Sequence, residues 1–414
     1  MKRLNPATQT WMNARPTRAV MRALTRDGGE ARFVGGAVRN ALLGEDVGDV
    51  DIATPLVPDE VMKRLEAAGL GVVPTGIAHG TVTAIASRKP FEVTTLRRDV
   101  STDGRRATVA FTTDWAEDAA RRDFTMNALY TDTEGTIFDY DNGLADLKAR
   151  RVRFVGDPPT RIREDYLRIL RLFRFHAWYG KGAMDAAALT AAIEARAGLK
   201  TLSGERVQKE LLRLLEARNP APAIFTMISS GIMSEILPAN LQVSRLQALI
   251  ALDAKNHSAP DGILRLAALL PVEAKVARSL ASQLKLSNAD KDRLTEALDA
   301  DPRIGLSMRA REARSVLYRM GKSCFRDQLL LRWASAGRDA RDPRWRFLFK
   351  HVNAWTKPEF PLNGRDAMAA GLDEGPKLGV VLRGLEQEWL DSDFALDRRA
   401  LLKRLKETIR KPRA

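Results

Sequence analysis

The sequence is poor in the residues that cross-link small secreted proteins or bind zinc through thiolates. Cys324 is its only cysteine, so the chain has no internal disulfide and no zinc site built from cysteines. No stretch of about 18 apolar residues occurs, and the first residues, Met-Lys-Arg-Leu-Asn-Pro, lead into no apolar run. We therefore expect neither a membrane span nor a secretory leader. These absences predict a soluble, cytoplasmic protein.

Acidic residues are also fewer than basic residues. The 414 residues include 67 Lys and Arg against 52 Asp and Glu, which gives a formal net charge of +15. A surplus of this size favours a polyanionic partner such as RNA, because its phosphates bind Lys and Arg and release counterions. The chain is long enough for several domains and a large buried core.

The residue composition and the hydrophobic periodicity of the sequence change near residue 150. Before it, short segments rich in Val, Ile and Thr and separated by Gly and Pro predict strands near 31–34, 49–53, 71–74, 80–87, 91–97, 107–112, 136–141 and 152–155. Helical turns are expected near 37–43 and 58–68, so a small mixed sheet with helices on one side fits this part. From Pro158 onward a 3.6-residue period predicts a series of helices, the first over 159–178.

Residues 33–54 carry the most informative pattern. A short apolar strand leads into Gly35 and Gly36, whose backbone can approach an anion closely, and the helix that follows offers free N–H groups. A second predicted strand carries Asp49 and Asp51, which point to the same face because they are two residues apart. Mg²⁺ binds a few carboxylate oxygens and leaves room for substrate phosphates. The pattern therefore indicates nucleotide chemistry.

Both halves of this pattern resemble motif A of the polymerase-β-like nucleotidyltransferases. The spelling Gly-Gly-x-Val-Arg from Gly35, followed by Asp-x-Asp-Ile-Ala-Thr from Asp49, is similar to that of class II tRNA nucleotidyltransferases (CCA-adding enzymes) and bacterial poly(A) polymerases. The resemblance implies that both aspartates are catalytic as ligands of Mg²⁺, with Gly36 at the phosphates. Arg39 is expected to contact the phosphates as well, with a structural ion pair as the alternative. One departure is Asn40, where the family usually has Asp.

The resemblance also implies the architecture. We expect an α/β head of the polymerase-β-like nucleotidyltransferase type at 1–150, built on a small mixed sheet. An all-α neck for base recognition is expected at 151–219, and a helical body and tail that bind tRNA at 220–414.

Three further segments of the head resemble the family. Glu92, in Glu-Val-Thr-Thr, is the candidate third metal-binding carboxylate, with a solvent-facing strand residue as the alternative. The segment His79-Gly-Thr-Val matches a family segment, and a positioning or core role for this histidine is preferred over a catalytic one. Residues 98–111 are expected to form a polar loop, which in CCA-adding enzymes assists the change from C to A incorporation. This loop favours CCA or A addition over CC addition.

Residues 118–129 resemble motif B of the family. Arg121 and Arg122 supply guanidinium groups suited to phosphates, and Asp123 can hold an arginine or a ribose hydroxyl. Asn127 is expected one helical turn from Asp123, where it can add a polar contact. The resemblance places Arg122, Asp123 and Asn127 at the nucleotide. Residues 141–147 resemble motif C and are expected to form a hinge.

Base choice is assigned to Asp165 and Arg168, which are three residues apart on a predicted helix and therefore neighbours. A carboxylate and a guanidinium match the amino donor and ring-nitrogen acceptor that cytosine and adenine share. Guanine and uracil would leave buried partners unpaired, at about 1–3 kcal/mol each. The pair matches the Glu-Asp-x-x-Arg motif D, with Tyr166 in place of the usual Pro; a simple intrahelical salt bridge is the alternative.

The resemblance adds Arg171 and Arg174 to the nucleotide-binding residues. Residues 203–211 resemble motif E, in which Glu205 and Arg206 are expected to brace the pocket. Aromatic residues between basic helices in the C-terminal half, such as Trp345, are expected in the core more often than as stacking platforms.

The function implied is template-independent addition of CMP and AMP from CTP and ATP to the tRNA 3′ end. Poly(A) polymerase or A-adding activity is the first alternative, and a non-catalytic RNA-binding relative is the second. Residues 76–80 stand where poly(A) polymerases carry a basic segment, which favours the tRNA enzyme. The four histidines are scattered and no His-Asp dipeptide occurs, so the phosphohydrolase domain of some relatives is not expected. The expected partners are tRNA, CTP and ATP, and no membrane.

Overall fold

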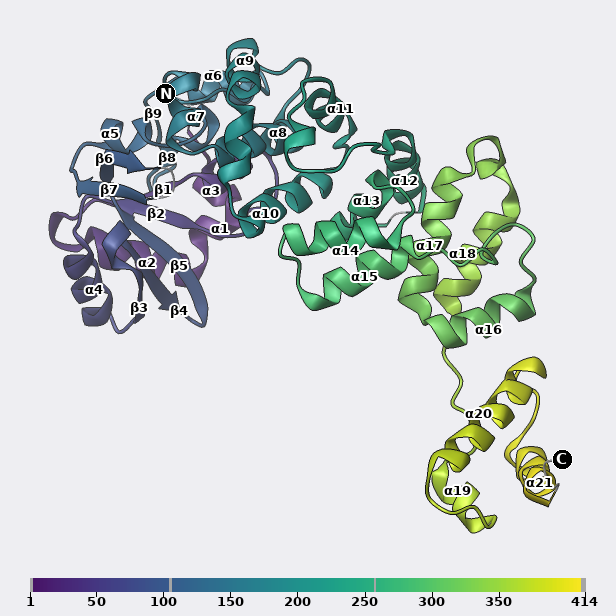
Figure 1. Ribbon diagram of the computed structural model, residues 1–414. Helices are drawn as coiled ribbons and strands as arrows, with labels where there is room; N and C mark the ends of the chain where they lie inside the picture. The colour runs from purple at the N-terminus through teal and green to yellow at the C-terminus, as the bar shows by residue number, and fades with distance from the viewer. Residues whose placement is uncertain (1–2, 104–105, 257, 411–414) are drawn as a thin grey trace. The chain divides into compact units, whose positions relative to one another are not determined.

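The computed structural model describes residues 3–103, 106–256 and 258–410 (Figure 1). At residues 99–103, 106–108 and 338 it describes the backbone only. The chain divides into two compact units, Met1–Ala239 and Asn240–Ala414. The first combines a sheet with helices and the second is helical, so the predicted order of an α/β head followed by helices is confirmed. The finer boundaries at 150 and 219 stay a prediction.

The head is built on a mixed sheet, as predicted. Within the described residues the strand order is β3-β4-β5-β2-β1-β8-β9, in which β2 and β5 are parallel and the other neighbours antiparallel. The strands are β1 (Arg32–Val34), β2 (Asp51–Thr54), β3 (Gly71–Gly76), β4 (Thr81–Ala86), β5 (Lys89–Thr95), β8 (Leu129–Thr131) and β9 (Ile137–Asp139). The short strand β8 was not predicted, and the strand predicted at 152–155 is only an isolated bridge between Phe154 and Phe124.

Helices cover both faces of this sheet, so the prediction of helices on one side is wrong. Helices α2 (Arg15–Thr25) and α4 (Pro58–Ala67) pack on the face that buries Ile52 and Val93. The opposite face carries Asp51, and α5 (Trp115–Ala120) covers part of it, where Trp115 joins a cluster with Val34 of β1, Ala53 of β2 and Tyr130 of β8. On the same face, over β3 to β5, side chains remain exposed.

The segment predicted as a polar loop at 98–111 forms a two-stranded antiparallel hairpin instead, and the strand predicted near 107–112 is its second strand. Strands β6 (Arg97–Asp103) and β7 (Arg106–Phe111) pair along their length, and residues 104–105 between them lie outside the described residues. The β-branched residues Thr108 and Val109 favour the extended backbone.

Helices complete the first unit after the sheet. The helix predicted over 159–178 is broken at Asp165 and Tyr166 into two helices. The remaining helices of this unit are α1 (Thr10–Asn13), α3 (Gly36–Leu43), α6 (Gly143–Lys148), α7 (Pro158–Glu164), α8 (Leu167–Tyr179), α9 (Ala186–Glu194), α10 (Gly204–Leu215) and α11 (Ala221–Ser229). Helices α8 and α10 pack against each other.

The second unit consists of helices held by apolar contacts and buried ion pairs. Arg265 pairs with Asp253 at 2.9 Å, and Trp345 is buried and stacks on Trp333, as expected of a core aromatic, whereas Phe347 is exposed. None of the helices in the described residues is long and apolar enough to cross a membrane. The helices are α12 (Val243–Asn256), α13 (Gly262–Leu269), α14 (Ala274–Gln283), α15 (Asn288–Leu298), α16 (Ala310–Met320), α17 (Lys322–Ser335), α18 (Pro343–Ala354), α19 (Gly364–Ala369), α20 (Pro376–Asp391) and α21 (Arg398–Arg410).

Candidate active site

The two glycines lie where β1 ends and α3 begins. Gly35 has a φ of 71°, which glycine adopts without strain, and it is the N-cap of α3. A β-carbon built on Gly35 would lie 3.9 Å from both Arg122 Nη1 and Asp51 Oδ2. The first turn of a helix, a guanidinium and a carboxylate therefore meet at one place. Such a place can hold a phosphate next to a metal ligand.

The candidate metal-binding carboxylates come from two strands and the bend before one of them. Asp51 is the first residue of β2, and its partner in the parallel pairing is Glu92 of β5. Asp49 was predicted on the same strand, but the strand begins at Asp51 and Asp49 lies exposed before it. Burial raises the pKa of Asp51, the carboxylates of Glu92 and Asp49 raise it further, and Arg122 acts against them.

These carboxylates fit a divalent cation that also binds a substrate. No group of three or more Asp, Glu, His or Cys within the described residues is arranged as a metal centre by itself. Mg²⁺ in nucleotide sites, however, commonly uses one or two carboxylates and takes its other ligands from phosphates and water. A bound cation would offset both the burial and the repulsion by the other carboxylates that raise the pKa of Asp51.

Arg122 is held in place by Asp118, a residue that the sequence analysis did not select. The buried Asp118 accepts hydrogen bonds from Arg121 (2.6 Å), Arg122 (2.9 Å) and the Tyr130 hydroxyl (2.7 Å). Burial acts to raise the pKa of Asp118, but the two guanidinium groups and the hydroxyl outweigh it and lower the pKa to about 2. The signal was present in the sequence, because Arg121 and Arg122 follow Asp118 at helical spacing.

Asp123 holds an arginine, one of the two roles considered for it. Its carboxylate accepts from Arg171 Nε at 2.9 Å and from Asn127 Nδ2 at 3.0 Å. Asn127 ends a 3-10 turn (Thr125–Asn127) that follows an isolated bridge, so the expected helical turn between the two is wrong although their side chains do meet. The buried Glu210 of α10, absent from the predicted residues, pairs with Arg174 at 2.5 Å and also with Arg171.

Arg39 is buried and its guanidinium already has several partners. It donates to Asn127 Oδ1 (2.6 Å), to Asn40 Oδ1 (2.8 Å) and to the Tyr179 hydroxyl (2.7 Å), and its guanidinium lies 3.9 Å from the centre of the Tyr179 ring. These contacts tie α3 to α8. His79, in contrast, has an exposed side chain, so the core role considered for it is wrong.

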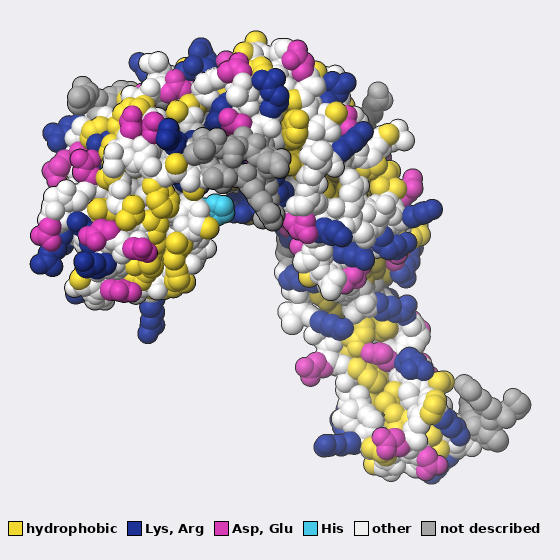
Figure 2. Space-filling model, turned by 60° about the vertical axis from the view of Figure 1, so that its left-hand side comes forward, with side chains coloured by type: hydrophobic (Ala, Val, Ile, Leu, Met, Phe, Trp, Pro, Cys, Tyr) yellow, Lys and Arg dark blue, Asp and Glu magenta, His cyan; other side chains and the backbone are white. Residues whose placement is uncertain are grey.

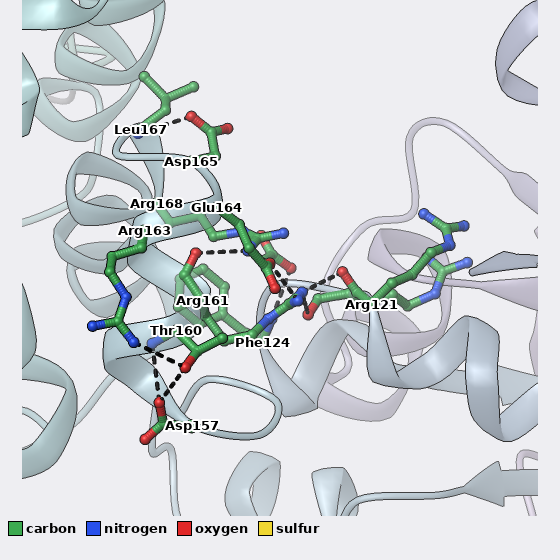
Figure 3. A network of polar contacts seen from close by, with 12 residues as sticks. Arg121, Phe124, Asp157, Thr160, Arg161, Arg163, Glu164, Asp165, Leu167 and Arg168 are labelled. Atoms are coloured by element: carbon green, nitrogen blue, oxygen red, sulfur yellow. Dashed lines mark hydrogen bonds and ion pairs between the residues drawn. The ribbon is translucent and has the colours of Figure 1, made fainter. Parts of the chain in front are cut away.

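Asp165 and Arg168 are not an ion pair with each other. Asp165 has an extended backbone between α7 and α8, and its carboxylate pairs with Arg206 of α10 at 2.7 Å. Arg168 pairs with Glu164 and donates to the Arg161 carbonyl at 2.7 Å. The alternative of an intrahelical salt bridge is therefore wrong, and each side chain is held by a different partner. Figure 3 shows Glu164 next to Arg168, with Asp165 apart from them.

Arg161 connects this region with motif B. Its guanidinium is buried, pairs with Glu164 at 2.5 Å and donates to the backbone carbonyls of Arg121 and Arg122 (Figure 3). Because Glu164 accepts from both Arg161 and Arg168, a continuous set of contacts joins the backbone at Arg121 to the side chain of Arg168.

The chain is similar to known proteins over most of its length. The family model described as Poly A polymerase head domain matches residues 31–153, and the one described as probable RNA and SrmB-binding site of polymerase A matches 184–241. CCA tRNA nucleotidyltransferase 1, mitochondrial, of Mus musculus is 36% identical over 400 residues, covering 92% of this chain and 87% of the relative. The CCA-adding enzyme of Levilactobacillus brevis is 31% identical over 400 residues, covering 93% and 96%.

A solved structure resembles this chain in fold along nearly its whole length. The crystal structure of the Bacillus stearothermophilus CCA-adding enzyme in complex with CTP superposes with a TM-score of 0.74 and 27% identity, over 99% of this chain and 98% of that one. The chain belongs to the CCA-adding tRNA nucleotidyltransferase family. Membership in this family implies dependence on a divalent metal ion.

Two residues depart from the usual pattern of CCA-adding enzymes, and both make defined contacts. Asn40 accepts from Arg39 and donates to the Asp46 carbonyl at 2.9 Å, so it retains a hydrogen-bonding role without a charge. The Tyr166 ring lies against Gly198, where a β-carbon would come within 2.2 Å of a ring carbon. Tyr166 therefore packs in a space that only glycine at 198 leaves open.

Proposed function

We propose that this chain adds CMP and AMP, from CTP and ATP, to the 3′ end of tRNA without a nucleic-acid template, and releases pyrophosphate. The observation that carries the proposal is the meeting of Asp51, Arg122 and the start of α3 at Gly35. This geometry supports a phosphate site next to a carboxylate pair, in a chain whose relatives are named for CCA addition. The Lys and Arg side chains spread over the visible surface support a polyanionic partner (Figure 2).

In this proposal the triphosphate lies between the Gly36 end of α3 and Arg122. Asp49, Asp51 and Glu92 would hold Mg²⁺, whose chemistry is to activate the acceptor hydroxyl and to neutralise the departing pyrophosphate. Arg39 acts by positioning, because its donors are engaged by side chains of the protein.

Base choice is proposed for Asp165 and Arg168. Arg206 holds the Asp165 carboxylate and Glu164 holds the Arg168 guanidinium, so both groups are oriented without pairing with each other. A carboxylate that accepts from an amino group and a guanidinium that donates to a ring nitrogen suit cytosine and adenine alike. Arg171 and Arg174 complete the proposed nucleotide site and are anchored by the buried Glu210.

Two parts of the proposal concern organisation and location. We assign residues 1–150 to the catalytic head, 151–219 to the base-recognising neck and 220–414 to tRNA binding.

We also propose a cytoplasmic location, for which the mitochondrial relatives provide the alternative. Cell fractionation with an antibody to the chain decides between the two.

The test is incorporation of each labelled nucleotide, singly and together, into tRNA that ends before CCA and into tRNA that ends in CC, with Mg²⁺ present. Two C additions followed by one A and then arrest are expected. A alone on the CC-ended tRNA would indicate an A-adding enzyme, and a long A tract a poly(A) polymerase. No incorporation would leave a non-catalytic RNA-binding protein.

A further inference from the structure

The second unit contains a cavity that is lined by none of the residues assigned to the nucleotide. Its volume is about 670 Å³, within the range of roughly 300–1,000 Å³ that is usual for small-molecule sites. Its walls come from α12, α15, α17 and α18, from the residues between α15 and α16, and from Val272 between α13 and α14. All of these elements belong to residues 240–414, so the cavity is formed within one compact unit.

Apolar side chains form much of the wall. The larger ones are Val272, Ile304, Leu306, Leu331 and Trp345. The Trp345 ring stacks on Trp333, with the ring centroids 6.3 Å apart and an angle of 10° between the planes, so its position is fixed by packing. A lining of aliphatic and aromatic side chains suits a ligand with an apolar, flat body.

Arg245 of α12 brings a buried positive charge to this wall. Its side chain is 6% exposed, and no carboxylate in the described parts of the chain pairs with it. The guanidinium donates to three carbonyl oxygens at the end of α13, those of Ala267 (3.0 Å), Ala268 (2.8 Å) and Leu270. These bonds use Nε and Nη2, and no acceptor among the described residues bonds to Nη1. Burial lowers the pKa of Arg245 to about 10, because taking the charge out of water is costly.

A second guanidinium, that of Arg332 on α17, lines the same cavity. It donates to the Asp301 carbonyl oxygen at 3.0 Å, whereas the Asp301 carboxylate pairs with Arg303. The remaining charged side chain of the described lining is Asp339, which is exposed. The lining thus carries two positive charges and one negative charge, so a ligand with a single negative charge, such as a carboxylate, balances it.

Gln328 of α17 fixes the segment that follows α15, so the cavity is formed before a ligand binds. This side chain is 2% exposed. Its Nε2 donates to the carbonyl oxygens of Glu296 (2.7 Å) and Asp299 (2.9 Å), and its Oε1 accepts from the Asp301 backbone N–H at 2.9 Å. A preformed cavity binds more tightly than one that must first be ordered, because less conformational freedom is lost on binding.

We propose that this cavity binds a small organic carboxylate, whose charged group pairs with Arg245 and Arg332 and whose apolar body lies against Trp345. The inference goes beyond the proposed function, because the cavity uses none of the residues assigned to nucleotide transfer. A guanidinium has five N–H donors in a planar fork, so each arginine can keep its carbonyl partners and still donate to the ligand.

Binding of 1-naphthylacetate to the full chain, measured by isothermal titration calorimetry, tests this proposal. The probe joins a flat apolar body to one carboxylate, and 1-naphthylacetamide has the same body without the charge. We expect a Kd of about 1 mM or lower for the carboxylate. The Kd of the amide should be about tenfold higher, because the charge-assisted hydrogen bonds are lost. Equal Kd values for the two probes, or no binding of the carboxylate, would overturn the proposal.

Two variants and a control show whether the probe occupies this cavity. Arg332→Gln removes one positive charge and should raise the Kd of 1-naphthylacetate about tenfold. Because Arg332 also holds the Asp301 carbonyl, Ser335→Trp provides a variant that keeps both arginines. Ser335 is an exposed residue of the lining, and the larger side chain should fill the cavity and abolish binding. Arg278→Gln, at an exposed position of α14 outside the lining, should leave the Kd unchanged. A Kd that is unchanged in both lining variants contradicts the assignment.

Competition separates this cavity from the sites of the two substrates. The titration of the unaltered chain with 1-naphthylacetate is repeated with saturating CTP and then with tRNA that ends before CCA. Neither should change the Kd of the probe, because the cavity is a separate site for a small molecule. Competition by CTP would place the probe in the nucleotide site, and competition by tRNA would assign the cavity to the RNA-binding surface. Either result would overturn the proposal and leave the proposed function intact.

Discussion

Replacing Asp118 with Asn removes the charge on which the motif B arginines converge. The carboxylate accepts from Arg121, Arg122 and Tyr130 and also from the Arg97 backbone N–H at 3.2 Å. Asn has nearly the same shape, so Asp118→Asn leaves the volume of the site unchanged. The amide nitrogen of the introduced asparagine is a donor, however, and it would face the guanidinium and hydroxyl donors that the Asp118 carboxylate now accepts from. We expect Arg122 to leave its position beside Gly35.

The pKa of Asp118 sets the expected loss of stability. It lies at about 2 against an ordinary 3.8, which corresponds to about 2 kcal/mol at neutral pH, since each tenfold change in proton affinity is worth about 1.4 kcal/mol. Because the folded-state pKa is the lower one, this stabilisation is complete above the unfolded-state pKa and is lost as the pH falls toward about 2. The variant should therefore be less stable than the parent at neutral pH, and the difference should shrink in acid below about pH 4.

Urea unfolding at neutral and acidic pH measures the difference, and steady-state kinetics with CTP measure the site. We expect KM for CTP to rise about tenfold, as for the loss of one charged phosphate contact. Glu117→Gln is the control, because Glu117 is also on α5 and accepts a hydrogen bond only from Thr112 among the contacts described. A variant as stable as the control at neutral pH, or a stability difference that persists unchanged in acid, would refute the reasoning.

Three further substitutions test other parts of the site. Asp51→Asn should abolish incorporation while tRNA binding in a filter assay persists, and chelation of divalent cations should have the same effect on the parent; an active variant would mean that the metal site is elsewhere. Asp165→Ala and Arg168→Ala should each weaken discrimination against GTP and UTP by about tenfold, because one base partner is lost; unchanged ratios of kcat/KM would leave both residues with a structural role. Gly198→Ala should lower stability by about 1–3 kcal/mol in thermal unfolding, because its β-carbon would meet the Tyr166 ring. The same change in a Tyr166→Ala background should cost little, and an equal cost there would contradict the steric explanation.

Local patterns in the sequence were sufficient for much of the head. The turn at Gly35 and Gly36 depends on backbone conformations that neighbouring residues determine, although Asp49 lies before the strand on which it was predicted. For this reason the nucleotide chemistry and the family were predictable. The strand β8, by contrast, is short and has no periodicity of its own, and it forms because the end of β1 offers it a partner.

The remaining features of the fold and of the site depend on contacts between residues that are far apart in the sequence. Glu92 lies beside Asp51 only because β5 pairs with β2 in one particular register, which a strand sequence alone does not determine. The helix predicted over 159–178 breaks where Asp165 reaches Arg206, 41 positions away, and where the Tyr166 ring fits against Gly198. The spacing of apolar residues shows which segments can be helical. It does not contain the partners that make an extended residue more favourable than another helical turn, because those partners meet only in the folded chain.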